Sequence, residues 1–197
     1  MRDWKRSLVV IVSKRLLLMP LALNDAEDVL GWINNPEIAK NFQFFNGNTS
    51  IGDEVRYIEK MRNSPNDLLL GVILEGEELI GTCGLHEIDF HNYTARLGVI
   101  IGKREHCNKG YAEEAIRALI VWAFSVMHLN KIYLSVFATN EKGIHLYTKV
   151  GFQVEAPRLR QEYRIRGAYV DMVRMAILRE EWEYVAQVAR TGIFPPE

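Results

Sequence analysis

The fold of this chain is decided by residues 140–152, which read Asn140-Glu141-Lys142-Gly143-Ile144-His145-Leu146-Tyr147-Thr148-Lys149-Val150-Gly151-Phe152. Asparagine is a favoured N-cap residue, so Asn140 predicts the start of a helix that runs from Glu141 to Val150. The apolar stretch before it, Ile132–Val136, predicts a strand. These residues therefore place a helix shortly after a strand.

A second informative stretch, Asn108-Lys109-Gly110-Tyr111-Ala112, lies between a predicted strand and a predicted helix. Small residues at such a junction let the backbone approach a ligand closely. The first N–H groups of a helix have no partner within the helix, and a turn of successive N–H groups can surround a diphosphate. The stretch is a candidate phosphate-binding loop, and the alternative is an ordinary turn.

The remaining elements are predicted from apolar periodicity and turn residues. They are a strand around 15–18, a helix with the N-cap Asn24 that ends at 34–36, a helix up to 63, strands 68–74, 79–88 and 95–101, a long helix from 111 to about 123, a hairpin of strands 154–163 and 168–177, and a short helix after 180. The strands from 68 to 101 predict an antiparallel meander.

The composition is that of one globular domain. The chain has 197 residues, 48% hydrophobic and 25% charged, which is enough for one core and too few for two ordinary ones. Its net charge of −1 gives no attraction for a nucleic acid. Cys83 and Cys107 are far apart, which argues against disulfides and a zinc site and fits the cytoplasm. No stretch has the length of a signal-peptide core or a membrane span.

Both stretches resemble the acetyl-CoA motifs of the GNAT superfamily of N-acetyltransferases. Residues 140–152 match the block Asn, about three residues, Ala or Gly, Ile, two residues, Tyr, three residues, Gly-Phe. Residues 107–112 match the motif Gln or Arg, two residues, Gly, one residue, Gly or Ala, except that Cys107 stands at the first position. The resemblance covers residues 16–178. Segments 14–21 and 169–175 are similar to the branch with ribosomal-protein alanine and spermidine N-acetyltransferases.

The resemblance implies a GNAT fold, an α+β arrangement with helices on both faces of a mixed, mostly antiparallel central sheet of about seven strands. It implies an N-terminal lead-in over 1–13, the N-acetyltransferase domain over 14–180, and a C-terminal helix and tail over 181–197. The implied reaction is acetyl transfer from acetyl-CoA, without a metal, to the primary amine of a protein N-terminus, a polyamine or another small amine. The amine attacks the thioester directly, since no cysteine or serine has a base at a suggestive spacing.

The resemblance also implies the cofactor-binding residues. They are Val99, Ile100 and Ile101 for the pantetheine arm, Asn108, Lys109, Gly110, Tyr111 and Ala112 for the diphosphate, and Asn140 and Tyr147 further along the chain. A strand backbone can hold the pantetheine amides like an added strand. Tyr147 would lie near the thioester sulfur, where a phenol with a free pKa of about 10 can donate to the leaving thiolate. The alternatives are a helix cap for Asn140 and an aromatic core residue for Tyr147.

The general base is not given by the resemblance, because many relatives place a carboxylate on the strand where this chain has Ala95-Arg96-Leu97-Gly98. Glu87, on the preceding strand, is the candidate catalytic base. Alternation of side chains places Asp89 on the same face as Glu87 and His86 on the other. The alternative is that Glu87 is a solvated carboxylate and that a chain of water molecules removes the proton.

The acceptor pocket is expected at the loop before the second helix and at the final hairpin. The implied residues are Trp32, Asn35, Phe42, Phe44, Phe45, Tyr163 and Tyr169. Residues 32–37 are also similar to nucleotide-amino-sugar acetyltransferases, which keeps an amino sugar as an alternative acceptor. A non-catalytic CoA-binding module is the other rival, because a fold does not guarantee activity. A homodimer is the expected assembly.

Overall fold

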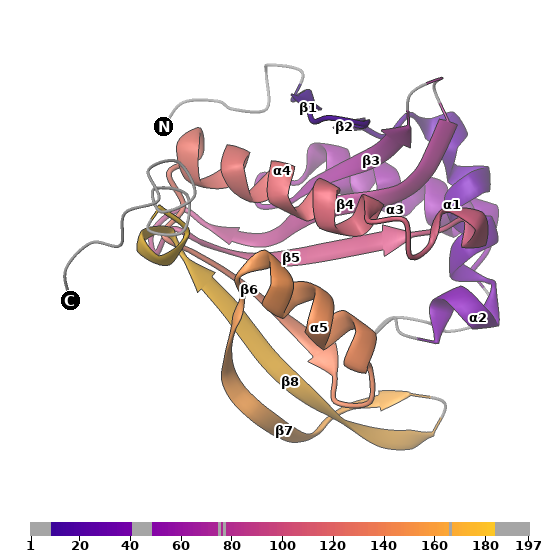
Figure 1. Ribbon diagram of the computed structural model, residues 1–197. Helices are drawn as coiled ribbons and strands as arrows, with labels where there is room; N and C mark the ends of the chain where they lie inside the picture. The colour runs from indigo at the N-terminus through magenta and orange to yellow at the C-terminus, as the bar shows by residue number, and fades with distance from the viewer. Residues whose placement is uncertain (1–8, 41–48, 75, 77, 166, 184–197) are drawn as a thin grey trace.

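The computed structural model describes residues 9–40, 49–74, 76, 78–165 and 167–183. Within these residues, eight strands form one sheet in the order β1-β2-β3-β4-β5-β6-β8-β7 (Figure 1). The strands are β1 (Ile11–Val12), β2 (Leu16–Pro20), β3 (Leu68–Leu74), β4 (Glu78–Asp89), β5 (Thr94–Ile101), β6 (Lys131–Phe137), β7 (Gln153–Ile165) and β8 (Ala168–Leu178). Every neighbouring pair is antiparallel except β5 and β6. The prediction of a mixed, mostly antiparallel sheet is confirmed.

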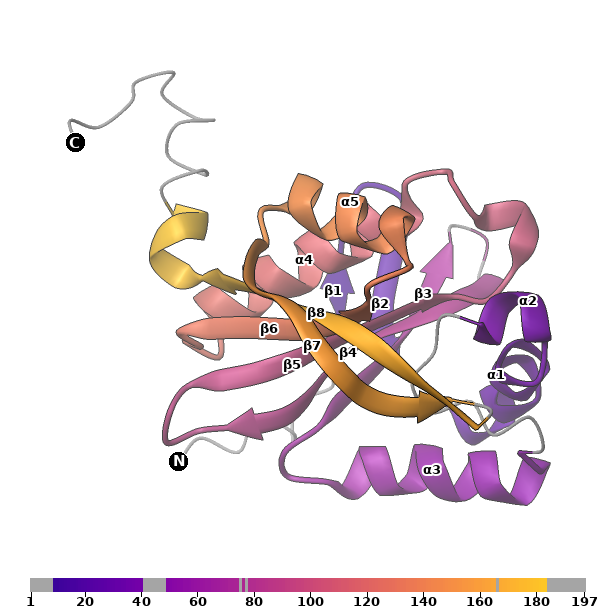
Figure 2. The same cartoon turned by 90° about the horizontal axis from the view of Figure 1, so that it is seen from below.

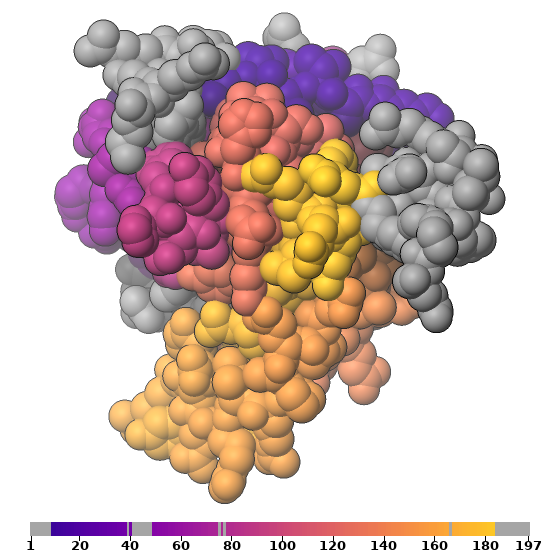
Figure 3. Space-filling model, turned by 90° about the vertical axis from the view of Figure 1, so that its left-hand side faces the viewer, coloured from indigo at the N-terminus to yellow at the C-terminus, as the bar shows by residue number. Residues whose placement is uncertain are grey.

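Helices cover both faces of this sheet, also as predicted (Figure 2). They are α1 (Ala26–Ile33), α2 (Pro36–Ala39), α3 (Ile51–Asn63), α4 (Tyr111–Ser125) and α5 (Glu141–Val150), with two 3-10 turns, η1 (Leu23–Asp25) and η2 (Arg104–His106). The helices α4 and α5 lie on one face, and α3 lies on the other beside α1. The hairpin of β7 and β8 extends away from the body of the molecule, and most side chains of β7 are exposed (Figure 3).

Two hydrophobic clusters hold the layers together. The larger one lies between the sheet and α4, where Ile116 and Leu119 are fully buried together with Ile132 of β6. The apolar spacing along α4 is three and four residues, which puts these side chains on the face that meets the sheet. The smaller cluster packs α1 and α3 against the sheet face opposite α4 and contains Trp32 and Ile58.

The structure differs from the sequence predictions at the first helix. Asn24 is not the N-cap of α1, because the helix follows η1 and its N-cap is Asp25. Ala22 is the N-cap of η1, and its backbone N–H donates to the Asp25 carboxylate at 2.7 Å, so the chain turns two residues earlier than predicted. The end of α1 agrees with the prediction, because the helix stops at Ile33 with Asn34 as its C-cap. A short helix that was not predicted, α2, then follows, with Asn35 as its N-cap. Proline is tolerated there because the first helical N–H has no partner within a helix.

The two ends of the chain also differ from prediction. Residues Ile11–Val12, expected to lead into the first strand, form β1 and pair with β2, which brings the sheet to eight strands instead of about seven. At the other end, residues 179–183 are helical, in line with the predicted C-terminal helix, and its remainder lies outside the described residues. None of the helices in the described part of the chain is long and apolar enough to cross a membrane.

Candidate active site

The sheet opens between β5 and β6. These two strands pair only at Thr94, Ala95 and Arg96 of β5. Beyond that point, β5 stays paired with β4 as far as Ile101, and β6 stays paired with β8 as far as Phe137. The edge of β5 after Arg96 therefore has no strand partner on the β6 side within the described chain. Its backbone N–H and C=O groups can pair with an extended ligand, as an added strand would.

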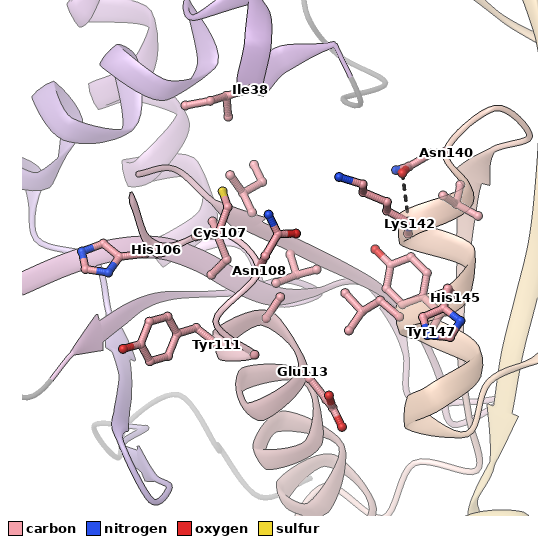
Figure 4. A pocket seen from close by; sticks show the side chains of 18 of the residues that line it. Ile38, His106, Cys107, Asn108, Tyr111, Glu113, Asn140, Lys142, His145 and Tyr147 are labelled. Carbon is pink, nitrogen blue, oxygen red and sulfur yellow. Dashed lines mark hydrogen bonds between the residues drawn. The ribbon is translucent and has the colours of Figure 1, made fainter. Parts of the chain in front are cut away.

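A cavity of about 870 Å³ lies at this opening. Its walls come from the end of β5, the start of α4, the end of β6 with α5, and α2 (Figure 4). All three predicted pantetheine residues, Val99, Ile100 and Ile101, line it. The structure thus brings together segments that are about 100 residues apart in the sequence.

The predicted phosphate loop lies at one end of this cavity. Asn108, Gly110, Tyr111 and Ala112 line the cavity, whereas Lys109 does not. Gly110 is the N-cap of α4 with a φ of 81°, and Asn108 also has a positive φ, of 59°. Glycine adopts this left-handed conformation without the steric cost of a Cβ. The loop therefore turns sharply just before the positive end of the α4 dipole.

Cys107 also lines the cavity at the position where the family motif has Gln or Arg. Its sulfur lies 3.6 Å from the Lys103 carbonyl oxygen, within the preceding turn. Arg104, His106 and Lys142 line the cavity as well and were missed from the sequence, because no periodicity brings these basic side chains together. Arg104 and Lys142 supply positive charge to the cavity lining, which suits a phosphate-bearing ligand.

Asn140 caps α5, as predicted. Its Oδ1 accepts a hydrogen bond from the Gly143 N–H at 3.0 Å. A Cβ on Gly143 would lie only 2.7 Å from Asn140 Nδ2, so the cap fits a glycine at this position. Asn140 also lines the cavity (Figure 4). The cap and a ligand contact are therefore compatible, because the cap uses Oδ1 and leaves the amide nitrogen for another partner.

Tyr147 lies on α5 with its side chain toward the cavity (Figure 4). Its ring packs edge-on against Phe152, with ring centroids 5.8 Å apart. Burial, with a smaller contribution from the nearby Cys83 thiol, raises the pKa of Tyr147 to about 12. The phenol is therefore neutral at ordinary pH and can donate a proton or a hydrogen bond into the cavity.

Glu87 lies outside the cavity lining. Its carboxylate accepts hydrogen bonds from Arg96 Nε and from the Tyr133 hydroxyl, both at 3.0 Å. The register of β4 shifts between His86 and Asp89, and Glu87 has a φ of 54°, so the strict alternation that the sequence predicted does not apply at this bulge. Tyr133 lies two residues before the cavity-lining Ser135 on β6, so the two side chains are on the same face of that strand.

The predicted acceptor residues are dispersed. Trp32 is buried against Gly102, Tyr169 is 63% exposed on the hairpin, and Tyr163 lies on β7; none of the three lines the cavity. Phe42, Phe44 and Phe45 lie outside the described residues. The short helix α2 contributes instead, through Asn35, Glu37, Ile38 and Lys40. Of these, only Asn35 is predicted from the sequence, because Pro36 was expected to end a helix.

The model of the acetyltransferase (GNAT) domain matches residues 15–153 of this chain, which include β5, the phosphate loop, α4 and α5. The chain belongs to the GNAT acetyltransferase family. This GNAT chain is 30% identical over 175 residues to the N-acetyltransferase p20 of Bacillus licheniformis, across 87% of this chain and 97% of that relative. It is 39% identical over 106 residues to a spermidine N(1)-acetyltransferase of Vibrio cholerae, across 54% of this chain and 60% of that relative.

A crystal structure of the Vibrio cholerae spermidine N-acetyltransferase in complex with CoA and spermine has the same fold. Its TM-score to this GNAT chain is 0.80 at 30% identity, over 87% of this chain and 99% of that one. The family match and these homologues make the chain an N-acetyltransferase, and GNAT acetyltransferases use acetyl-CoA. The matched residues fall inside the predicted domain 14–180, whose two bounds remain predictions.

Proposed function

We propose that this enzyme transfers the acetyl group of acetyl-CoA to a primary amine of a polyamine such as spermidine. The observation that carries the proposal is the cavity at the β5–β6 opening, where the edge of β5, the phosphate loop and Tyr147 meet. The choice of a polyamine is supported by the similarity to spermidine N-acetyltransferases, one of them solved with CoA and spermine.

In this proposal the pantetheine arm lies along β5. The backbone of Val99–Ile101 offers amide donors and acceptors on the side that β6 has left. The diphosphate accepts hydrogen bonds from the N–H groups of residues 108–112 at the start of α4. Asn140 contributes its amide nitrogen to the pantetheine arm.

The reaction is a direct transfer. The neutral amine nitrogen attacks the thioester carbonyl carbon, the new N–C bond forms, and the C–S bond breaks with its electrons on sulfur. Tyr147 donates its phenolic proton, or a hydrogen bond, to the departing thiolate. Since burial raises the pKa of Tyr147 to about 12, the proton is present on the phenol throughout the pH range in which amines become neutral.

Glu87 is the proposed acceptor of the amine proton. The carboxylate is engaged by Arg96 and Tyr133, and we propose that the proton reaches it through water and the Tyr133 hydroxyl. The competing route passes the proton directly to bulk water. Tyr163, Tyr169, Trp32 and the three phenylalanines at 42, 44 and 45 remain predictions as acceptor contacts, as do a cytoplasmic location and a homodimer.

The decisive experiment is an acetylation assay against spermidine, spermine, peptides with free N-termini and nucleotide amino sugars. We expect a kcat/KM for spermidine at least about tenfold above that of any peptide or sugar, equivalent to about 1.4 kcal/mol of transition-state discrimination. A preferred peptide or sugar would reassign the acceptor. Binding of acetyl-CoA without turnover of any amine would instead favour the non-catalytic module.

A further inference from the structure

Arg15 joins the first strands to the phosphate loop although it lies about 95 residues before that loop. It occupies the turn between β1 and β2, and its side chain extends to the start of α4. Arg15 Nε lies 2.6 Å from Glu114 Oε2, and the Arg15 backbone N–H donates to Glu114 Oε1 at 2.7 Å. The Ser13 hydroxyl donates to the same Oε1 at 2.9 Å. The first turn of α4 is thereby fixed to the β1–β2 turn.

The same guanidinium contacts the loop itself. Arg15 Nη1 donates to the Lys109 carbonyl oxygen at 3.2 Å. The guanidinium carbon lies 4.5 Å from the ring centroid of Tyr111, a favourable cation–π distance. The Tyr111 ring also meets the His106 ring edge-on, with centroids 5.8 Å apart. Arg15 therefore touches three successive parts of the loop and helix start: Lys109, Tyr111 and Glu114.

The contact with the Lys109 carbonyl has a consequence for the next residue. In a planar trans peptide, the C=O of one residue and the N–H of the following residue point in opposite directions. Because the Lys109 carbonyl points to Arg15, the Gly110 N–H points away from Arg15. Gly110 lines the cavity, whereas neither Arg15 nor Lys109 does. The orientation of this peptide therefore decides whether a donor faces the cavity.

Lys109, which supplies the carbonyl of this peptide, lies between two residues in the left-handed region. They are Asn108 and Gly110, with φ values of 59° and 81°. Such a conformation costs energy for a residue other than glycine, so it persists only where the surroundings fix it. A loop that binds phosphate through backbone N–H groups depends on their direction, since these donors cannot be re-aimed by a side-chain rotation. The Arg15 hydrogen bond is the contact in the described chain that holds the Lys109 carbonyl.

We propose that Arg15 is a positioning residue of the donor site, which orients the Lys109–Gly110 peptide so that the Gly110 N–H can bind the diphosphate of acetyl-CoA. Arg15 acts from behind the loop and does not itself contact the ligand. Because Cys107 supplies no cationic side chain at the motif position, the backbone donors of the loop act together with the cations of Arg104 and Lys142 in the cavity lining, and Arg15 orients one of these donors. This inference rests on the proposed function of the cavity.

The test compares two acetyl donors on the wild type and on Arg15→Met, which removes the guanidinium but keeps an unbranched side chain. Acetyl-CoA carries the diphosphate, whereas S-acetylpantetheine lacks it. For Arg15→Met we expect the Kd of CoA, by calorimetry, and the KM of acetyl-CoA to rise about tenfold, with kcat changed by less than about twofold. The kcat/KM for S-acetylpantetheine should stay within about twofold of the wild type.

Arg56→Met is the matched control, because Arg56 forms an ion pair with Asp53 on α3 and does not line the cavity. Arg56→Met should leave the Kd of CoA, the KM of acetyl-CoA and the kcat/KM for S-acetylpantetheine at their wild-type values. An unchanged CoA Kd in Arg15→Met, or an equal loss with both donors, would overturn the positioning role. Should Arg15→Met fail to fold, Glu114→Gln is measured in the same way, since it loosens the charged partner of Arg15. Failure of the wild type to bind CoA would instead count against the proposed function.

Discussion

The ring of Tyr147 meets the ring of Phe152 edge-on, with centroids 5.8 Å apart. Phe152 is 2% exposed and belongs to the main core, whereas Tyr147 is partly buried and lines the cavity. Edge-to-face aromatic pairs are attractive and prefer defined geometries. The core thus fixes the direction of the Tyr147 side chain, and its hydroxyl is the part left to act on a ligand.

Replacing Tyr147 by phenylalanine separates chemistry from packing. The ring contact with Phe152 is kept and one hydroxyl is lost, so unfolding free energy should change by no more than about 1 kcal/mol. If the hydroxyl donates to the leaving thiolate, kcat should fall on the order of 10²-fold, with the Kd of CoA little altered. Steady-state kinetics measures the change in kcat, and a denaturation curve measures the change in unfolding free energy. Wild-type turnover in a folded variant, with chemistry rate-limiting, would remove Tyr147 from the mechanism.

The dependence of kcat on high pH should report the same residue. A general acid works in its protonated form, so activity is lost only as pH rises through its pKa. Burial raises the pKa of Tyr147 to about 12, and the phenol should remain protonated at pH 10.5. We therefore expect kcat with spermidine to show no decline between pH 8 and 10.5 in short assays. A descending limb near pH 10, absent from Tyr147→Phe, would mean that the phenol has an ordinary pKa.

Gly110→Glu should abolish binding of the donor. A side chain at a φ of 81° is strained, and a Cβ on Gly110 would lie 3.5 Å from Arg15 Nη2, so a glutamate there would disturb the contact that orients the loop. Acetyl-CoA at about 100 times its Kd should raise the melting temperature of the wild type by about 5 to 10 °C and that of Gly110→Glu not at all. Gly167→Glu is the control, since Gly167 has a φ of 85° on the hairpin, outside the cavity lining. A full shift in Gly110→Glu would place the diphosphate elsewhere.

Gly102→Ala should destabilise the protein, although Gly102 itself does not line the cavity. A Cβ on Gly102 would lie 1.8 Å from Cδ2 of Trp32, a side chain that is only 6% exposed. Overpacking of this kind costs about 1–3 kcal/mol or more. Gly31→Ala on α1 is the control, because a Cβ on Gly31 would meet no other side chain within 4 Å and alanine favours a helix by about 1 kcal/mol. Urea denaturation measures the unfolding free energy of each variant. A Gly102→Ala value equal to that of the wild type would show that Trp32 can move aside.

Glu87→Gln should lower kcat/KM more at pH 7 than at pH 9.5. An alkylamine is mostly protonated at the lower pH, where removal of a proton is most needed. The exposed carboxylate Glu162 on β7 provides a control, Glu162→Gln, which should leave the profile unchanged. Parallel pH profiles of wild type and Glu87→Gln would show that water, and not Glu87, removes the proton.

Local features of the structure were predictable from the sequence because neighbouring residues determine them. Helix α5 has its predicted bounds, Glu141–Val150, since Asn140 caps its first turn whatever lies around it. The phosphate loop was recognisable for the same reason, as a glycine before a helix. The family motifs at residues 107–112 and 140–152 are short runs of sequence, and they identified the enzyme class through these two segments.

Non-local contacts had to come from the tertiary structure. The opening after Arg96 exists because β6 stops pairing with β5 there while it remains paired with β8. The residues of β5 or β6 alone do not predict where this pairing stops. The burial of Trp32 against Gly102 and the contact of Arg15 with Lys109 join residues 70 or more positions apart. Side-chain chemistry and short-range spacing are properties of the sequence. The direction in which a side chain or a backbone N–H points at the site is set by packing between distant segments, and only the folded chain decides it.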